Sequence, residues 1–392
     1  MVENVTIVGG GIGGLCAAIA CAERDTNVTL FEARSRLGGR ARSTDGEFVA
    51  NYGPHVLYDD GPFWRWLGER GLAEPAAKGP LTGVRFRYGD NIHRLPPARL
   101  ARVARLVRQG AVPTGLSARE WLTRERDAVT AELATRLCHV FTFHHDPGSL
   151  SAAFIAERAR RAFALPPAAR YVEGGWSELV ARLERHARNV GVNIVTGTKI
   201  TELPEPPVIV ALDLRAARTL LGDDALSWHG ARTALLDVGL MTGNRDPFLL
   251  FDLDHGVFFE RYSKPDPSLA PAGQQLVQAQ VGLAPRATID EGVARIENAF
   301  DAALPTWRRR EVWRRSVLVE DASGALDPPG TTWRDRPQID QGHGVFLVGD
   351  MVAAPGLLSE VSWASALEAA RLIRLTQPAA TQAAVSREWR AR

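Results

Sequence analysis

The sequence of 392 residues contains few of the features that mark secreted or membrane-spanning proteins. Its three cysteines, Cys16, Cys21 and Cys138, cannot all pair with one another, so we expect small buried side chains in a reducing compartment. No uninterrupted apolar run approaches the roughly 18 to 20 residues that span a bilayer. Because the first strand is expected almost at the N-terminus, the sequence predicts no signal peptide and a cytoplasmic protein.

An excess of charge of one sign is also absent. The chain has 47 Lys and Arg against 45 Asp and Glu, a formal net charge of +2, which gives no reason to expect a nucleic-acid partner. Lysine is scarce and occurs only at Lys78, Lys199 and Lys264. Hydrophobic residues make up 45% of the chain, enough for sizeable cores, and the length indicates roughly two or three domains.

The clearest local pattern lies at the start of the chain. A short β-branched run, 5–8, leads into Gly9, Gly11 and Gly14, which fit G-x-G-x-x-G, and then into a helix rich in small residues. In this pattern the glycines allow a tight turn, let a pyrophosphate approach the backbone, and let the helix pack on the strand. A second strand, 27–32, ends in Glu32, where ribose hydroxyls would lie. The register of strand, turn, helix, strand and acid favours a dinucleotide site over a turn without a ligand.

A second glycine pair follows the acid. Residues 36–43 read RLGGRARS, in which arginines that can bind a phosphate bidentately flank Gly38 and Gly39. A nicotinamide dehydrogenase has no need of this stretch. The chain here resembles the FAD-dependent amine oxidase and phytoene desaturase superfamily, which has R-x-G-G-R just after the ribose-binding acid. The resemblance implies non-covalently bound FAD.

The resemblance reappears at four further places. They are Gly53-Pro54-His55, the stretch 174–179, the turn 266–273 (DPSLAPAG), which is similar to the phytoene-desaturase-like branch, and Gly349-Asp350 with the helix after it. Carried over position by position, the resemblance implies these cofactor-contacting residues: Gly9, Gly11, Gly13, Gly14, Glu32, Ala33, Arg34, Gly38, Gly39, Arg40, Gly53, Pro54, His55, Ile200, Ala211, Gly349, Asp350, Leu358, Ser359 and Val361.

The C-terminal part of this set has a physical basis of its own. A buried strand, 344–348, ending in Gly349-Asp350 would let the glycine approach the ribityl-pyrophosphate chain while the carboxylate accepts hydrogen bonds from hydroxyls. Ser359 is predicted to be the N-cap of the next helix, with Leu358 and Trp363 as a hydrophobic staple. The resemblance places this helix N-terminus at the flavin, where its dipole would stabilise the negative charge of the reduced ring.

The middle of the chain has a different character. The patterns predict helices over about 119–140 and 151–164, strands over 192–196, 199–201 and 207–211, and then strands over 235–241, 248–252, 257–261 and 275–281. Residues 99–108 form a basic amphipathic helix, which can lie on an anionic membrane surface but is better explained as the solvated face of a cap helix. His144, His145 and Asp146 have no matching second cluster, so no metal site is predicted.

The fold class predicted from these elements is α/β, with a Rossmann-like FAD-binding domain interleaved with an α+β substrate domain made of an antiparallel sheet and a helical cap. The FAD-binding domain is predicted to comprise residues 1–75, 171–233 and 335–392. The substrate domain is predicted to comprise residues 76–170 and 234–334.

The functional prediction is an FAD-dependent oxidoreductase that removes hydride from a C–H bond of a small to medium, largely apolar metabolite and passes the electrons to O2 or another acceptor. His55 and Lys264 are candidate catalytic residues. Ala353 to Leu358 replace the glycine-rich stretch of phytoene desaturases, and the chain is shorter than most relatives, which argues against a long polyene substrate.

Three alternatives remain open at this point. The first is an amine or amino-acid oxidase, a branch in which a lysine near flavin N5 commonly holds a water, a role for which Lys264 is the candidate. The second is a redox-neutral isomerase, and the third is a protein that binds FAD without turnover. Nothing in the sequence specifies the oligomeric state or the electron acceptor.

Overall fold

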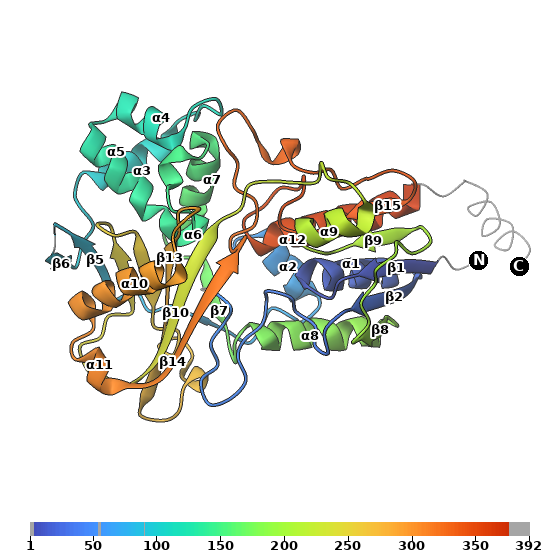
Figure 1. Cartoon of the computed structure of the whole chain (residues 1–392), viewed down its shortest axis with the longest axis horizontal. Coiled ribbons are helices and arrows are strands. Elements are labelled where there is room, and N and C mark those ends of the chain that lie inside the picture. The colour runs from blue at the N-terminus through green and yellow to red at the C-terminus, as the bar shows by residue number, and fades with distance from the viewer. Residues whose placement is uncertain (1–3, 54–55, 90, 376–392) are drawn as a thin grey trace, which may run out of the picture.

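The computed structural model describes residues 4–53, 56–89 and 91–375, which form two lobes (Figure 1). One lobe is built on a parallel five-stranded sheet, and the other on a mixed seven-stranded sheet with helices above it. A small three-stranded sheet is made of β3 (Leu57–Tyr58), β4 (Ala76–Lys78) and β7 (Ala169–Val172). The fold class is therefore α/β with a separate, largely antiparallel sheet, as predicted.

The parallel sheet has the strand order β15-β9-β1-β2-β8. Its strands are β1 (Asn4–Val8), β2 (Asn27–Glu32), β8 (Asn193–Thr196), β9 (Val208–Val210) and β15 (Val345–Leu347). The carboxyl ends of parallel strands meet at one edge, so residues from three distant stretches of the chain are brought together there.

Three helices pack together beside this sheet. They are α1 (Ile12–Ala22), α8 (Trp176–Asn189) and α12 (Ser359–Leu375), and α1 contacts both of the others. The small side chains of α1 are almost completely buried, which allows this close packing. Cys16, Cys21 and Cys138 are buried, as predicted, and form no disulfide with one another. Two further helices of this lobe are α2 (Pro62–Glu69) and α9 (Leu214–Leu221).

The mixed sheet has the order β14-β10-β13-β12-β11-β5-β6. Its strands are β5 (Val84–Tyr88), β6 (Asn91–His93), β10 (Arg232–Met241), β11 (Leu249–Asp252), β12 (Val257–Glu260), β13 (Gln274–Gly282) and β14 (Glu311–Glu320). Every neighbouring pair is antiparallel except β5 and β11, which run parallel. The four strands predicted here are confirmed, whereas β14 and α10 (Ile289–Ala303) were not predicted.

The two faces of this sheet differ in chemistry because successive side chains of a strand point to opposite sides. One face carries Leu236, Val238 and Val277, which pack with Phe300 of α10. The opposite face carries buried polar side chains, which we call the polar sheet face: Asp237, Glu260, Gln278 and Gln280. A buried polar face is expensive unless its groups are hydrogen-bonded or have a functional partner, so this face is a candidate for the substrate side.

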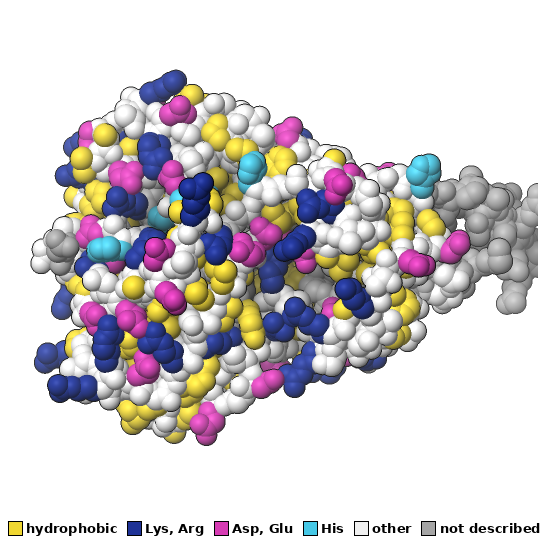
Figure 2. All heavy atoms as spheres, viewed as in Figure 1, with side chains coloured by type: hydrophobic (Ala, Val, Ile, Leu, Met, Phe, Trp, Pro, Cys, Tyr) yellow, Lys and Arg dark blue, Asp and Glu magenta, His cyan; other side chains and the backbone are white. Residues whose placement is uncertain are grey.

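The cap consists of α3 (Leu100–Gln109), α4 (Ala118–Glu125), α5 (Ala128–Leu137), α6 (His139–Thr142) and α7 (Ala152–Ala162). Leu100 and Val103 of the basic helix α3 are buried in a cluster with residues of α4, α5 and α7. The apolar stripe of α3 is thus used for packing inside the cap. Figure 2 shows charged side chains of both signs interspersed over one face of the molecule.

Some local predictions were wrong. Residues 199–201 do not form a strand: β8 ends at Thr196, and the backbone is irregular after it. Short helical segments not predicted are α11 (Trp307–Arg310) and three 3₁₀ turns, Pro147–Ser149, Pro267–Leu269 and Trp333–Asp335. Within the described ranges, no helix combines the length and apolarity needed to cross a bilayer. The exact boundaries between the two predicted domains stay a prediction.

Candidate cofactor and substrate site

The two glycine motifs of the sequence lie side by side. The N–H of Gly38 donates to the carbonyl of Gly10 at 2.8 Å, and Gly11 and Gly38 form an isolated parallel bridge. The Cα of Gly11 is only 3.6 Å from where a Cβ of Gly39 would be. Two stretches that each suit a phosphate therefore form one continuous surface at the carboxyl edge of the parallel sheet.

The glycines of the first motif have different roles. Gly9 has φ +110°, and a Cβ there would lie 2.3 Å from the carbonyl oxygen of Ala211. A Cβ at Gly14 would lie 1.9 Å from the carbonyl oxygen of Gly9. At Gly11, in contrast, a Cβ would meet nothing within 4 Å. Gly9 and Gly14 are required for packing, while Gly11 borders open space in which a pyrophosphate could approach the backbone.

Glu32 is the last residue of β2, and its carboxylate is held by the backbone. One oxygen accepts the N–H of Gly10 at 2.9 Å, and the other accepts the N–H of Arg34 at 2.9 Å. A carboxylate has about four acceptor positions, so both oxygens can still accept hydrogen bonds from ribose hydroxyls. The predicted ribose ligand thus also holds the glycine loop in place.

The second motif is joined to the end of β15 by an ion pair. The Arg40 guanidinium lies 2.7 Å from Asp350 Oδ1 and also donates to the carbonyl of Asp321. The charge of Asp350 is the main reason that the pKa of Arg40 lies above its ordinary value. Gly349 donates its N–H to Ser365 Oγ of α12 at 3.2 Å. Three predicted cofactor residues are therefore gathered at one place by contacts that the sequence does not reveal.

The start of α12 differs from the prediction. Ser359 is the first helical residue, so its prediction as the N-cap is wrong. Leu358 precedes the helix with φ +55°, and Glu360 closes its N-terminus by accepting the N–H of Leu357 at 3.0 Å. Glu360 also forms a two-bond ion pair, at 2.5 and 3.0 Å, with Arg161 of α7. This pair ties the cap to the helix terminus that was predicted to face the flavin.

Other residues predicted to contact the cofactor or the substrate lie in separate parts of the chain. Gly53 is buried with φ +129°, whereas Pro54 and His55 lie outside the described residues. Ala211 donates its N–H to the carbonyl of Val8 at 2.8 Å at the sheet edge. Lys264 is exposed in a turn after β12.

Ala33, Ile200 and Val361 were also predicted to contact the cofactor. Ala33 is exposed directly after β2. Ile200 is half-buried shortly after β8 and packs against the hydrophobic core of the parallel-sheet lobe. Val361 is buried in the same core.

A buried acid on the polar sheet face was missed by sequence reasoning. Glu260 is 3% exposed and accepts a hydrogen bond from the hydroxyl of Tyr171, which comes from β7. Burial raises the pKa of Glu260 to about 7. The rings of Tyr171 and Tyr262 lie edge to face, 5.6 Å apart. The only sequence signal was an acid at the end of an otherwise apolar strand.

A polar network connects the same sheet face to the segment that leads to Gly53. Arg315 Nε donates to Asp237 Oδ2 at 2.9 Å, and Gln278 Nε2 donates to Asp237 Oδ1 at 3.0 Å. Gln278 also donates to the carbonyl of Asn51 at 2.8 Å. The ring of Tyr52 lies 4.2 Å and 4.5 Å from the guanidinium carbons of Arg42 and Arg315, respectively. This network fixes where the backbone of residues 51–53 runs.

Comparison with known proteins agrees with this geometry. Residues 7–69 match the family model described as an NAD(P)-binding Rossmann-like domain. A solved oxidoreductase from Methanosarcina mazei superposes with a TM-score of 0.76 over 93% of this chain and 99% of that one, at 18% identity. Cyclohexylamine oxidase from Brevibacterium oxydans IH-35A superposes with a TM-score of 0.72 over 95% of this chain and 99% of that one, at 15% identity. The chain has the fold of the flavin-dependent amine oxidase and desaturase superfamily.

Sequence relatives belong to the same flavin oxidoreductase group. The 4,4'-diapolycopen-4-al dehydrogenase of Metabacillus indicus is 24% identical over 243 residues, which is 50% of each chain. The carotenoid 3,4-desaturase of Haloarcula japonica is 44% identical over 64 residues, 16% of this chain and 11% of that protein. The chain thus spans half or less of the length of these relatives.

Proposed function

We propose that the chain is an FAD-dependent oxidoreductase that removes hydride from a C–H bond of a small to medium metabolite. The observation that carries this proposal is the convergence of both glycine motifs with Glu32 at the carboxyl edge of the parallel sheet. A nicotinamide dinucleotide would need only the first motif, whereas the second offers a further backbone surface for a phosphate.

The residues present suit FAD. The open space beside Gly11 accommodates a pyrophosphate, and the N-terminus of α1 supplies unpaired N–H groups and a positive dipole end. Glu32 would hold the adenosine ribose, while Arg40 and Asp350 would hold the phosphate and ribityl hydroxyl groups. The N-terminus of α12 would lie at the flavin. No covalent link is proposed, because all three cysteines are buried.

The chemistry divides between the cofactor and the chain. FAD, when bound, supplies the hydride acceptor. Loss of hydride from carbon must be accompanied by loss of a proton when a C=C or C=N bond forms. Glu260 is a buried carboxylate with a pKa near neutrality, so it can take up that proton at a carboxylate oxygen while Tyr171 holds the carboxyl group in place. The buried sheet around it excludes water.

The polar sheet face bears on the choice of substrate. The hydroxyls of Tyr171 and Tyr262 occupy two of the roughly four acceptor positions of the buried Glu260 carboxylate. We therefore propose a largely apolar metabolite with one polar group beside the reacting carbon that can use another of these positions. One observation favours an amine oxidase as the second candidate. Glu260 is a buried carboxylate whose partners are the hydroxyls of Tyr171 and Tyr262, and no cation among the described residues is paired with it, so it could pair with an ammonium group of a substrate. Lys264, the lysine considered for that branch, is exposed in a surface turn.

Anaerobic stopped-flow spectroscopy tests this proposal. The holoprotein is mixed with a panel of cyclic and aromatic amines and a matched panel of unsaturated alcohols and acids, and bleaching of the flavin absorbance is followed. Bleaching by one panel identifies the reaction class. Glu260→Gln should slow the step, whereas Glu205→Gln, an exposed loop control, should leave it unchanged. Purified protein that carries no flavin and binds none on addition would refute the proposal.

A further inference from the structure

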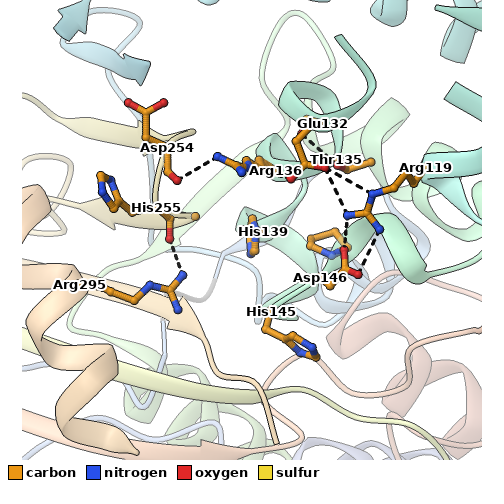
Figure 3. Close-up of a pocket in the computed structure, with 12 residues that line it drawn as sticks. Arg119, Glu132, Thr135, Arg136, His139, His145, Asp146, Asp254, His255 and Arg295 are labelled. Atoms are coloured by element: carbon orange, nitrogen blue, oxygen red, sulfur yellow. Dashed lines mark hydrogen bonds and ion pairs between the residues drawn. The ribbon is translucent and has the colours of Figure 1, made fainter. Parts of the chain in front are cut away.

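A second polar site lies away from the candidate cofactor site. It is a cavity of about 180 Å³ between α4, α5 and α6 of the cap, the turn after β11, and α10 (Figure 3). We call it the arginine–histidine pocket, because its lining includes Arg119, Arg136, Arg295, His139, His145 and His255. In Figure 3 the ring of His139 lies in the middle of the view, with the three arginines around it. None of the residues predicted to contact the cofactor lines this pocket.

The carboxylates of the pocket already have partners. Arg119 Nη2 lies 2.6 Å from Asp146 Oδ1 and 3.3 Å from Glu132 Oε2. Arg136 Nε lies 2.8 Å from the other oxygen of Glu132. Asp254 Oδ1 accepts the N–H of Gly89 at 3.2 Å. The acidic side chains are thus used to hold the walls of the pocket together.

The donors, in contrast, exceed the acceptors available to them. Arg295 donates to the backbone carbonyls of Gly282, at 3.2 Å, and His255, and contacts no carboxylate of the described chain. The Nδ1 atom of His139 is buried and has no hydrogen-bond partner, in a side chain that is only 7% exposed. The charge of Asp252 favours the charged form of Arg295 but lies beyond ion-pair distance. A partly buried guanidinium with no ion pair and a buried imidazole nitrogen with no hydrogen bond are both costly, so both favour a ligand.

The charges around His139 and His145 also bear on which ligand the pocket could hold. Burial is the main reason that the pKa values of His139 and His145 are lowered, and the positive charge of Arg295 lowers both further. The three arginines and three carboxylates of the lining balance in formal charge, and Asp146 acts on the pKa of His145 in the opposite direction to Arg295. Arg119 and Arg136 are paired with carboxylates, so the charge that an anion could meet is that of Arg295. A metal ion would be repelled by the guanidinium groups, and the described part of the chain holds no group of three His, Cys, Asp or Glu suited to a metal.

We propose that the arginine–histidine pocket binds a small oxyanion of the phosphate type, either free or as the phosphate group of a metabolite. Guanidinium and imidazole donors are the groups that recognise tetrahedral oxyanions, and the cavity has room for one together with water. The ligand would accept hydrogen bonds from Arg295, His139 and His145, and the ion pairs of Arg119 would keep the opposite wall in shape. This site is independent of the proposed oxidoreductase function.

Isothermal titration of the purified holoprotein with inorganic phosphate tests the proposal. We expect saturable binding that weakens at least about tenfold in Arg295→Gln. Arg295 also holds two backbone carbonyls, so thermal unfolding must show that the variant is folded. His145→Gln is the second variant, because His145 is exposed and its removal leaves the packing intact; binding should weaken several-fold. Arg309→Gln, an exposed arginine of α11 outside the pocket, is the matched control and should bind as wild type does.

The same titration with glycerol 3-phosphate distinguishes the two sources of the oxyanion. Tighter binding of the phosphomonoester would assign the pocket to a phosphorylated metabolite, and tighter binding of inorganic phosphate would assign it to the free ion. Absence of saturable heat from either probe up to about 10 mM, or equal affinity in wild type, Arg295→Gln and His145→Gln, would overturn the proposal.

Discussion

At the residue scale, two glutamates show how the surroundings of a carboxylate decide its use. Glu32 and Glu260 each end a strand. Glu32 is only partly buried and accepts two backbone N–H groups, so it acts as an acceptor beside the glycine loop. Glu260 is buried against Tyr171, and burial raises its pKa to about 7, so it can exchange a proton near neutrality.

Replacing Glu32 should weaken FAD binding through two separate losses. In Glu32→Ala both the ribose acceptor and the acceptor for the N–H groups of Gly10 and Arg34 disappear, and we expect a loss on the order of 2 to 3 kcal/mol of binding free energy. Glu32→Gln keeps one oxygen and should lose less. Titration of the apoprotein with FAD measures both, and an affinity unchanged in Glu32→Ala would remove Glu32 from the site.

Glu260 should make the free energy of unfolding depend on pH. Its pKa is about 7 in the folded protein against 4.5 ordinarily, so the folded state binds the proton more strongly. Stability from this group is therefore fully present below about pH 4.5 and falls as pH rises through 7. Glu260→Gln, which retains an acceptor for Tyr171, should lose this decline and gain up to roughly 3 kcal/mol relative to wild type above pH 7.

Chemical denaturation at a series of pH values checks the Glu260 prediction. The quantity compared is the difference in unfolding free energy between variant and wild type, which cancels the other titrating groups. Glu205→Gln, on an exposed loop, should run parallel to wild type. Parallel curves for Glu260→Gln as well would mean that the pKa of this carboxyl is the same in the folded and the unfolded protein.

At the scale of elements, the N-terminus of α12 is the most unusual feature. Leu358 adopts φ +55°, a conformation that costs a β-carbon residue on the order of 1 kcal/mol or more. The strain is held by Glu360, which bonds the N–H of Leu357 and pairs with Arg161 of the cap. A helix end held this rigidly keeps its dipole in a constant position, which suits a site that must stabilise a negative charge.

Leu358→Asp should lower the midpoint potential of the bound flavin if this helix end faces the ring. The new carboxylate would repel the anionic reduced cofactor by on the order of 1 kcal/mol, or roughly 20 mV for a two-electron couple. Leu358→Asn is the matched control, because Asn has the same shape, tolerates positive φ equally well and carries no charge. Spectroelectrochemistry measures both potentials. Equal potentials in the two variants, with FAD bound, would place α12 away from the flavin.

At the scale of the molecule, polar contacts join the two lobes around the candidate site. Arg161 on α7 pairs with Glu360 on α12, and Gln278 on β13 bonds the backbone of Asn51. Groups on both sides of the site are thus positioned by each other as well as by their own lobes. A cofactor bound between them would stabilise the whole fold by mass action.

FAD should be released completely by acid precipitation and should raise the melting temperature when it is added back. Release is expected because Cys16 and Cys21 are buried in α1 and Cys138 is buried between α5 and α6, so none can form a thioether with the flavin. Burial also raises the pKa of the Cys138 thiol to about 12, which keeps it unreactive. Yellow colour retained in the denatured pellet would contradict the prediction, and a melting temperature independent of FAD would contradict binding itself.

The sequence by itself determined the parts of this protein that are local. The strand, turn, helix and strand from Asn4 to Glu32 could be predicted because each step has a pattern within a few residues, and the glycine positions follow from steric needs of the backbone. The four strands between residues 232 and 282 were visible for the same reason. Fold class followed from the order of these elements.

Only the tertiary structure decided which distant residues meet. Tyr171 and Glu260 come from different strands and sheets, and Arg161 reaches Glu360 from the cap, so neither contact leaves a pattern in neighbouring residues. The same applies to the start of α12. Glu360, and not Ser359, closes this helix end, because its carboxylate accepts the N–H of Leu357 and forms a long-range ion pair with Arg161. Local propensity determines elements, whereas burial and charge pairing between elements determine the site.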